Sequence, residues 1–197
     1  MKWKNIKNWK LGPFFSGRLL FIAFIAITIF EAIDVITTEK KQLVFEVALK
    51  ESEPQSDIMS QNANIVHGYM LKIDSPGWFY SFVLENNIGW SPLHSIIFLI
   101  VWTCGFWVTL KLDPNNFFSK DLSRPIAIAA LSLILFFFIE RYTHRSFRTT
   151  VQEITHNQFK LVWLENSWML WTGIGLAWLS KIMRSGYQLQ KEQDPTV

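Results

Sequence analysis

Four strongly apolar blocks, separated by polar segments, divide this chain of 197 residues. They cover about residues 16–38, 87–112, 123–141 and 161–183, and the second has no charged residue between Glu85 and Lys111. An α-helix needs about 20 apolar residues to cross the ~30 Å hydrocarbon core of a bilayer. The blocks therefore predict an all-α membrane protein with four transmembrane helices packed as a four-helix bundle. The length alone favours one or two soluble domains, but the four apolar blocks are stronger evidence for a membrane protein.

The first block follows a basic start, "MKWKNIKNWK", and together they are typical of a secretory signal peptide. No small-residue cleavage pattern follows, because the next residues are Glu31, Ala32, Ile33 and Asp34. We expect an uncleaved first span, so that residues 1–197 form a single integral membrane domain.

The distribution of charge predicts the orientation of the spans. An even number of spans places both termini on one side, where the segments carry 11 basic and 4 acidic residues, against 8 and 12 on the other side. Cytoplasmic flanks collect Lys and Arg, so both termini and the tail 184–197 are predicted to be cytoplasmic. No stacking or phosphate-binding motif accompanies the basic N-terminus, and the expected partner there is the lipid bilayer rather than nucleic acid.

Two extracytoplasmic loops, residues 39–86 and 142–160, are predicted to form a small cap. In the first, "QLVFEVALK" alternates apolar and polar residues, and "NIVHGYMLKI" does so less cleanly, which predicts two strands and a β-hairpin. In the second, Phe147, Val151, Ile154 and Gln158 stand at helical spacing. The β-branched content of that loop fits a strand equally well, so both alternatives stay open.

Glu31 and Asp34 are the least expected residues of the first block. They are three residues apart and share a helix face. A carboxylate that faces lipid costs about 2.5–3.5 kcal/mol even on the lenient insertion scale. We therefore expect both to face the bundle interior or an outward water pocket. Side chains expected at matching depth complete an intramembrane polar cluster: His94, Glu140, Arg141 and His144. An ion pair of Arg141 with Glu31 or Asp34 would join two helices and give the cluster a purely structural role.

The same cluster also allows functional interpretations. All four histidines, His67, His94, His144 and His156, fall on or near the outer side. Imidazole and carboxylate groups together bind Zn²⁺ or related metals, and imidazole titrates near pH 6.5. No HExxH or other tight ligand spacing is present, so the sequence leaves metal binding open. Proton-coupled transport is a further alternative, although the chain shows no repeated half of the kind that many transporters have.

The sequence offers little for an enzyme. Ser91 and His94 share a face, but such a pair arises too readily by chance to predict a catalytic triad. The single Cys104 excludes an intrachain disulfide framework and a cysteine-rich metal site. We predict no catalytic residues and no cofactor.

Two short cytoplasmic stretches, "NFFSKDLSRPI" (116–126) and "MRSGYQLQKEQDPTV" (183–197), resemble motifs of the domain-of-unknown-function 2975 family. The resemblance implies a multi-pass protein of the bacterial cytoplasmic (inner) membrane without assigned activity, often encoded beside a small helix-turn-helix regulator. Pro195 departs from the family, which usually has an apolar residue there. The charges of the two stretches allow them to meet and form a partner-binding surface. Its candidate residues are Ser119, Asp121, Arg184, Gly186, Leu189, Glu192 and Asp194.

The function predicted from the sequence is a non-enzymatic membrane protein with a sensory, regulatory or scaffolding role. Its expected partners are a cytoplasmic helix-turn-helix regulator or another membrane protein, and homo-oligomers are compatible with it. The alternative is a small transporter or ion- or proton-handling protein that uses the acidic and histidine cluster. A metal-dependent membrane enzyme is the third.

Overall fold

The computed structural model describes residues 13–37, 42–49, 63–66, 70–74, 77–84, 91–113, 117–118, 120–161 and 167–193. The described residues form five helices and four strands. In chain order they are α1 (Pro13–Thr37), β1 (Gln42–Leu49), β2 (Ala63–Val66), β3 (Met70–Asp74), α2 (Trp78–Val83), α3 (Pro92–Lys111), α4 (Ser123–Ile154), β4 (Phe159–Leu161) and α5 (Trp168–Gln193).

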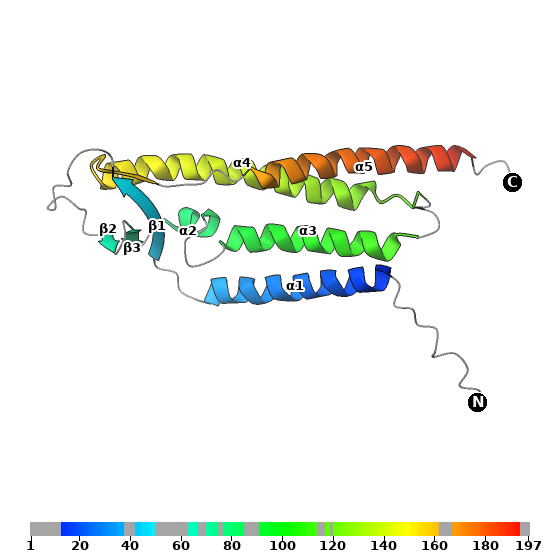
Figure 1. Cartoon of the computed structure of the whole chain (residues 1–197), viewed down its shortest axis with the longest axis horizontal. Coiled ribbons are helices and arrows are strands. Elements are labelled where there is room, and N and C mark those ends of the chain that lie inside the picture. The colour runs from blue at the N-terminus through cyan, green and yellow to red at the C-terminus, as the bar shows by residue number, and fades with distance from the viewer. Residues whose placement is uncertain are drawn as a thin grey trace, which may run out of the picture.

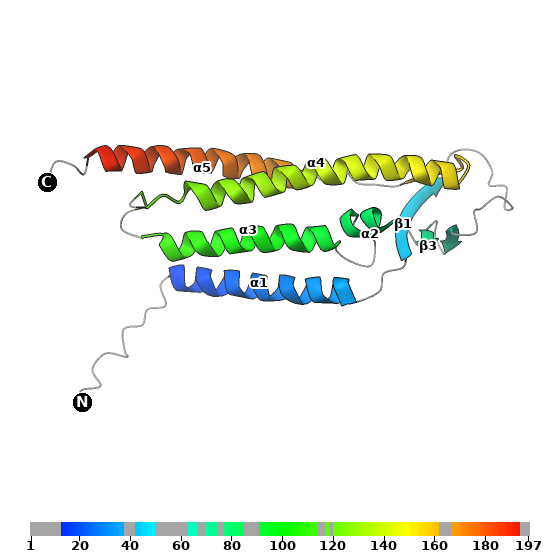
Figure 2. The ribbon, with the colours of Figure 1, turned by 180° about the vertical axis from the view of Figure 1, so that it is seen from behind.

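The four long helices lie side by side with their axes nearly aligned (Figures 1 and 2). Helix α1 packs against α3, α3 against α4, and α4 against α5. Among the described residues, α1 makes its extensive contacts with α3 alone. The arrangement is therefore an open row rather than the closed four-helix bundle that the sequence predicted, and a row encloses no central interior.

Each long helix overlaps one of the four predicted apolar blocks. Helix α5 begins seven residues later than the predicted fourth span, at Trp168, and continues to Gln193 through most of the predicted tail. Two of the long helices, α3 and α4, are long and apolar enough to cross a membrane. For α1 and α5, a membrane span stays a prediction. Pro92 begins α3 behind the cap residue Ser91, whose side chain accepts a hydrogen bond from the His94 N–H. Proline suits this first turn because its missing N–H has no partner to lose there.

The small sheet at one end of the row differs from the predicted hairpin. Its strand order is β2-β3-β1-β4, and every neighbouring pair is antiparallel. "NIVHGYMLKI" forms two strands, β2 and β3, instead of one. The predicted alternation in β1 is confirmed at Leu43, Phe45 and Val47, which are buried, while Glu46 is exposed.

Helix α4 runs much further than predicted. The third span was expected to end near residue 141, with a loop over 142–160, but the helix continues to Ile154. A turn follows, in which His156 and Asn157 have positive φ angles of 47° and 65°. Strand β4 then pairs with β1. The two alternatives for the second loop thus both occur, the helix in its first part and the strand in its last.

The C-terminal part of α4 and the sheet together form a second core, which we call the core of the cap. Phe147, on α4, is 1% exposed, and its ring centroid lies 4.8 Å from that of Phe45 in β1 and 5.1 Å from that of Tyr80 in α2. The Tyr80 hydroxyl also lies 3.1 Å from the Ser146 hydroxyl of α4. The other buried members are Leu43, Val47, Leu71, Ile73, Leu84, Val151 and Phe159. One helix therefore belongs both to the row and to the cap.

Candidate functional site

Three residues of the predicted polar cluster meet where the row joins the cap. The Nε2 atom of His94, in α3, lies 3.7 Å from Oε1 of Glu140, in α4. The Nε2 atom of His144, one turn further along α4, lies 3.8 Å from the same oxygen. The side chains of His94, His144 and Glu140 are 3%, 5% and 13% exposed. The structure thus brings two imidazoles to one buried carboxylate.

The surroundings hold the His94 ring in place. Its Nδ1 lies 2.7 Å from the Ser91 hydroxyl, the cap residue of α3. The Phe136 ring of α4 packs edge-on against it, with centroids 4.5 Å apart. Ring nitrogen and hydroxyl exchange donor and acceptor roles with the tautomer, so Ser91 can serve either form of His94.

The distances between the imidazoles and the carboxylate determine what kind of interaction joins them. Separations of 3.7 and 3.8 Å exceed the 2.7–3.2 Å of an N–H···O hydrogen bond, so attraction to Glu140 depends on a protonated imidazole. A carboxylate that is largely removed from water is stabilised by a nearby positive charge. Within the part of the chain that the structure describes, no group of three or more His, Cys, Asp or Glu residues is arranged to hold a metal ion.

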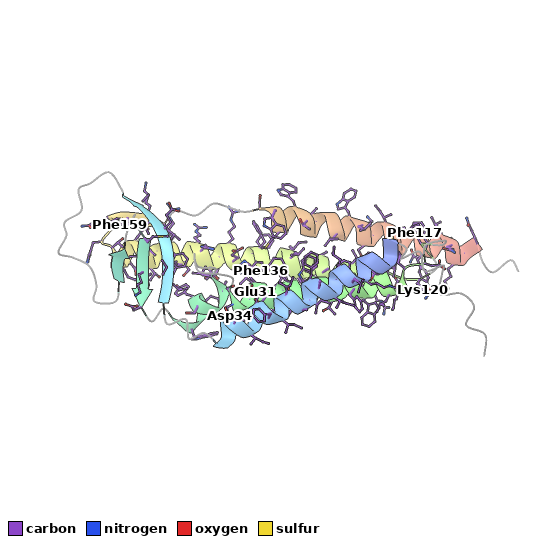
Figure 3. All side chains as sticks on the ribbon, turned by 60° about the horizontal axis from the view of Figure 1, so that its bottom comes forward. Glu31, Asp34, Phe117, Lys120, Phe136 and Phe159 are labelled. Atoms are coloured by element: carbon purple, nitrogen blue, oxygen red, sulfur yellow. The ribbon has the colours of Figure 1, made fainter. Side chains whose placement is uncertain are left out.

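Glu31 and Asp34 lie apart from this cluster. Both are exposed on α1 (Figure 3), whereas the sequence predicted that they face either the bundle interior or an outward water pocket; the first alternative is wrong. The α3-facing side of α1 presents instead Thr28, which is 2% exposed and donates to the Phe24 carbonyl oxygen at 2.8 Å. Because an open row has no enclosed centre, a carboxylate on its first helix has no protein interior to face.

The acids nevertheless lie level with the cluster. Near the other end of α1, the Arg18 guanidinium donates to the Thr109 carbonyl oxygen of α3, and the Phe24 ring stacks on Trp102 at 4.6 Å. This antiparallel register brings Glu31 beside the first turns of α3, where His94 lies. Glu31 and the His94 cluster therefore lie at the same level of the row, although the side chains of Glu31 and Asp34 are exposed.

The remaining predicted residues occupy different places. Arg141 is exposed, with its guanidinium carbon 5.8 Å from the centroid of the Phe137 ring. His156 is exposed in the turn after α4. His67, Ser119 and Asp194 lie outside the described residues.

At the opposite end of the row, the two family-like stretches meet. The Ser180 hydroxyl of α5 donates to the Ser123 carbonyl oxygen at 2.8 Å. The Phe118 ring lies against Gly186, and a methyl group added to that glycine would overlap the ring. This contact, which we call the inner junction, joins the loop before α4 to α5. Phe118 and Ser123 lie within the stretch 116–126 but were not among the predicted partner-binding residues, and neither was Ser180. A glycine within a helix, here Gly186, is a signal of close approach that could have pointed to this contact.

Asp121 anchors the inner junction. Its carboxylate accepts hydrogen bonds from the hydroxyl and from the N–H of Ser123, the latter at 3.0 Å. The hydrogen bond from the Ser123 hydroxyl is the largest influence on the pKa of Asp121 and lowers it, against the opposite effect of desolvation. The hydrogen bond from the Ser123 N–H and the positive charges of Arg124 and Arg184 lower this pKa further. Beyond the junction α5 continues to Gln193, with Leu189 60% exposed and Glu192 also exposed. The arrangement presents a charged surface with an apolar centre.

Comparison of this chain with protein-family models, curated proteins and solved structures finds no match. The resemblance to the 2975 family therefore stays a prediction that rests on the two quoted stretches.

Proposed function

We propose that this chain is a non-enzymatic sensory or regulatory protein of the bacterial cytoplasmic membrane. In this proposal α1, α3, α4 and α5 are four spans, the cap is outside, and both termini are cytoplasmic. The apolar length of α3 and α4 and the excess of basic residues at the ends of the row away from the cap support it.

The observation that carries the proposal is the continuity of α4. It is one helix of 32 residues, about 48 Å long at 1.5 Å per residue. Its outer part supplies Phe147 to the core of the cap, and its first residue, Ser123, accepts the hydrogen bond of the inner junction. A shift of α4 in response to a change at the cap would therefore alter the junction directly.

The buried cluster supplies the input. Glu140 and His144 are on α4 and His94 is on α3, so a change in their charge alters the attraction between these two helices. Arg141 and Arg145 are exposed on the same helix beside the cluster. Because imidazole titrates near pH 6.5 in water, acidification outside the cell is the stimulus to test first.

The inner junction supplies the output. Five of the predicted partner-binding residues lie at or beyond this junction: Asp121, Arg184, Gly186, Leu189 and Glu192. An exposed leucine among charged residues fits a docking surface for a protein partner. A cytoplasmic regulatory protein is the partner that we propose, with Ser119 and Asp194 as further candidate contacts.

Spin labels test the coupling between the two ends. In full-length protein with Cys104→Ala, labels at Lys120→Cys and Leu189→Cys report the separation of the loop before α4 from the C-terminal part of α5. We expect the distance distribution in liposomes to change when the external pH falls from about 7.5 to about 5.5. Glu140→Gln should abolish the change, because the amide no longer attracts a protonated imidazole.

The matched control is Glu153→Gln, an exposed glutamate of the same helix. It should respond to pH as the unsubstituted protein does. An unchanged distribution in the unsubstituted protein, or a response that survives Glu140→Gln, contradicts the proposed input.

Ion or proton transport is the second candidate, and the buried imidazole–carboxylate cluster is the observation that favours it. Glu31 and Asp34, which the transport hypothesis also used, are on the exposed face of α1. Proton flux into liposomes that contain the purified protein, lost with Glu140→Gln, would support transport. If no proton flux is measured while the spin-label distance at the inner junction changes with pH, the results support the sensory function over transport.

A further inference from the structure

Basic side chains gather on both helices of the inner junction. Four exposed bases lie there, two around the start of α4 and two on α5: Lys120, Arg124, Lys181 and Arg184. In the segments 117–124 and 178–186 that carry them, Asp121 is the one acidic residue. Figure 3 shows Lys120 at the end of the row away from the cap. This end of α4 and α5 therefore carries more positive than negative charge.

These bases lie where the apolar stretches of α4 and α5 end. The sequence has no charged residue from 125 to 139 or from 166 to 180. The Ser180 hydroxyl donates to the Ser123 carbonyl oxygen at 2.8 Å. Their chain neighbours Lys181 and Arg124 therefore lie at the same level of the row. If both helices span the membrane, as proposed above, this level is the boundary between hydrocarbon and headgroups.

An exposed tryptophan on α5 lies close to the same level. Trp178 is 72% exposed and precedes Lys181 by three residues, so the two side chains share a face of the helix. Indole rings prefer the headgroup region, where the ring meets hydrocarbon and the N–H meets water. Phe117 and Phe118, near Lys120 in the sequence, are 49% and 36% exposed. Aromatic and basic side chains together are typical of a protein surface that contacts lipid headgroups.

The arginines of this surface remain open to an external anion. Within the described part of the chain, the ion pair that these bases form joins Arg124 Nε to Asp121 Oδ2 at 4.0 Å, which is too long for a hydrogen bond. The Arg124 side chain is 89% exposed. The Asp121 carboxylate instead accepts two hydrogen bonds from Ser123. Arg184 also lies close enough to lower the pKa of Asp121, so arginines of two helices converge on one point.

The chemistry of this surface fits a phosphate group. A guanidinium presents two parallel N–H donors to phosphate oxygens, and lysine adds a compact positive charge on a flexible stem. At a membrane boundary the abundant phosphates are those of phospholipids, and anionic headgroups attract each nearby Lys or Arg. Leu189 and Glu192 lie further along α5 toward its C-terminus and stay available to a protein partner.

We propose that the inner junction binds the headgroup phosphate of an anionic phospholipid, held by Arg124 of α4 and Arg184 of α5. Lys120 and Lys181 add positive charge around the site. A lipid bound in this way joins α4 to α5, so the lipid composition of the inner leaflet regulates how readily the two helices separate at the junction. The inference rests on the proposed membrane insertion and not on the response of the cap to pH.

Lipid binding to the purified full-length protein in a non-ionic detergent tests the site. Native mass spectrometry measures the dissociation constants of phosphatidylglycerol and of phosphatidylcholine with the same acyl chains. We expect phosphatidylglycerol to bind at least about tenfold more tightly, since its net negative charge meets two arginines. Arg124→Gln with Arg184→Gln should bring the two dissociation constants to within about threefold of each other.

Arg145→Gln with Arg148→Gln is the matched control, because both arginines are exposed on the part of α4 at the cap. It removes the same charge and should keep the preference for phosphatidylglycerol. Arg124→Lys with Arg184→Lys keeps the charge but loses the paired donors. This variant should bind phosphatidylglycerol more weakly than the unsubstituted protein and more tightly than the glutamine variant, and it keeps the test if the glutamine variant fails to fold.

Equal dissociation constants for the two lipids in the unsubstituted protein would overturn the proposal. A preference that survives Arg124→Gln with Arg184→Gln, or that the matched control also loses, would do so as well. Inorganic phosphate that binds and displaces the lipid would assign the site to a free phosphate instead. Resistance of the membrane-bound protein to alkaline extraction reports insertion separately, so a missing lipid preference in an inserted protein contradicts this inference alone.

Discussion

The Nε2 atom of His94 and the Oε1 atom of Glu140 face each other at 3.7 Å across the contact between α3 and α4. The Glu140 carboxylate lies near two imidazoles, so its negative charge is what attracts a protonated histidine in this cluster. We expect Glu140→Gln to lower the free energy of unfolding by about 1–3 kcal/mol near pH 6, where an imidazole can carry a proton. Denaturant titration in detergent micelles measures it, and Glu153→Gln should change stability by less than about 0.5 kcal/mol.

The core of the cap depends on one aromatic side chain of α4. Phe147→Ala removes the ring between Phe45 and Tyr80, and the loss of a fully buried Phe costs about 3–5 kcal/mol. We expect faster proteolysis of the cap, with protection of α3 retained. Phe138→Ala, on the same helix at a residue 56% exposed, is the control and should leave the rate unchanged. Equal proteolysis of both variants would contradict the cap core described above.

The start of α4 should depend on pH through Asp121. Its folded pKa is lowered chiefly by the Ser123 hydrogen bonds, so its contribution is complete above the ordinary pKa of about 3.9 and is lost as pH falls through the lower folded pKa. Asp121→Asn should cost about 0.5 kcal/mol at neutral pH, a small value because the side chain is 34% exposed and solvent screens its charge. Unfolding curves at several pH values should show this difference vanish in acid. A difference in the free energy of unfolding that grows as the pH falls would contradict a lowered pKa of Asp121.

The contact of Phe118 with Gly186 gives a test of the inner junction. Alanine at an open helical glycine stabilises a helix by up to about 1 kcal/mol, and Gly175→Ala, with open space around it, should show this gain. Gly186→Ala should not, because its methyl group would overlap the ring. The two substitutions should become equivalent in a Phe118→Ala background. Thermal unfolding of the four variants measures the coupling, and a Gly186→Ala gain with Phe118 present would argue against the contact.

The apolar blocks predicted the long helices because block length is a local property of the chain. The end of α4 was missed because "ERYTHRSFRTTVQEI" is polar on its exposed side and resembles a loop in composition. Phe147 and Val151 did show helical spacing, but that spacing cannot tell whether a segment continues an existing helix. Packing of Phe147 and Val151 in the core shared with β1, β3 and α2 stabilises the continuation.

Part of the candidate site could also be predicted, because position along a helix is a local property of the chain. His94, Glu140 and His144 were grouped by depth, which follows from counting residues along a helix. Depth does not say which way a side chain points around the row. Glu31 and Asp34 were predicted to face an interior or an outward water pocket, and an open row provides no such interior. The helix order that opens the row arises from contacts such as Phe24 with Trp102.

Labelling of single cysteines from the two sides of the membrane tests the account most directly. In Cys104→Ala protein, a membrane-impermeant maleimide should modify Arg148→Cys only from outside the cell and Leu189→Cys only from the cytoplasmic side. That result would show that α4 carries the cap and the inner junction on opposite faces of the bilayer. Modification of both cysteines from the same side would contradict it.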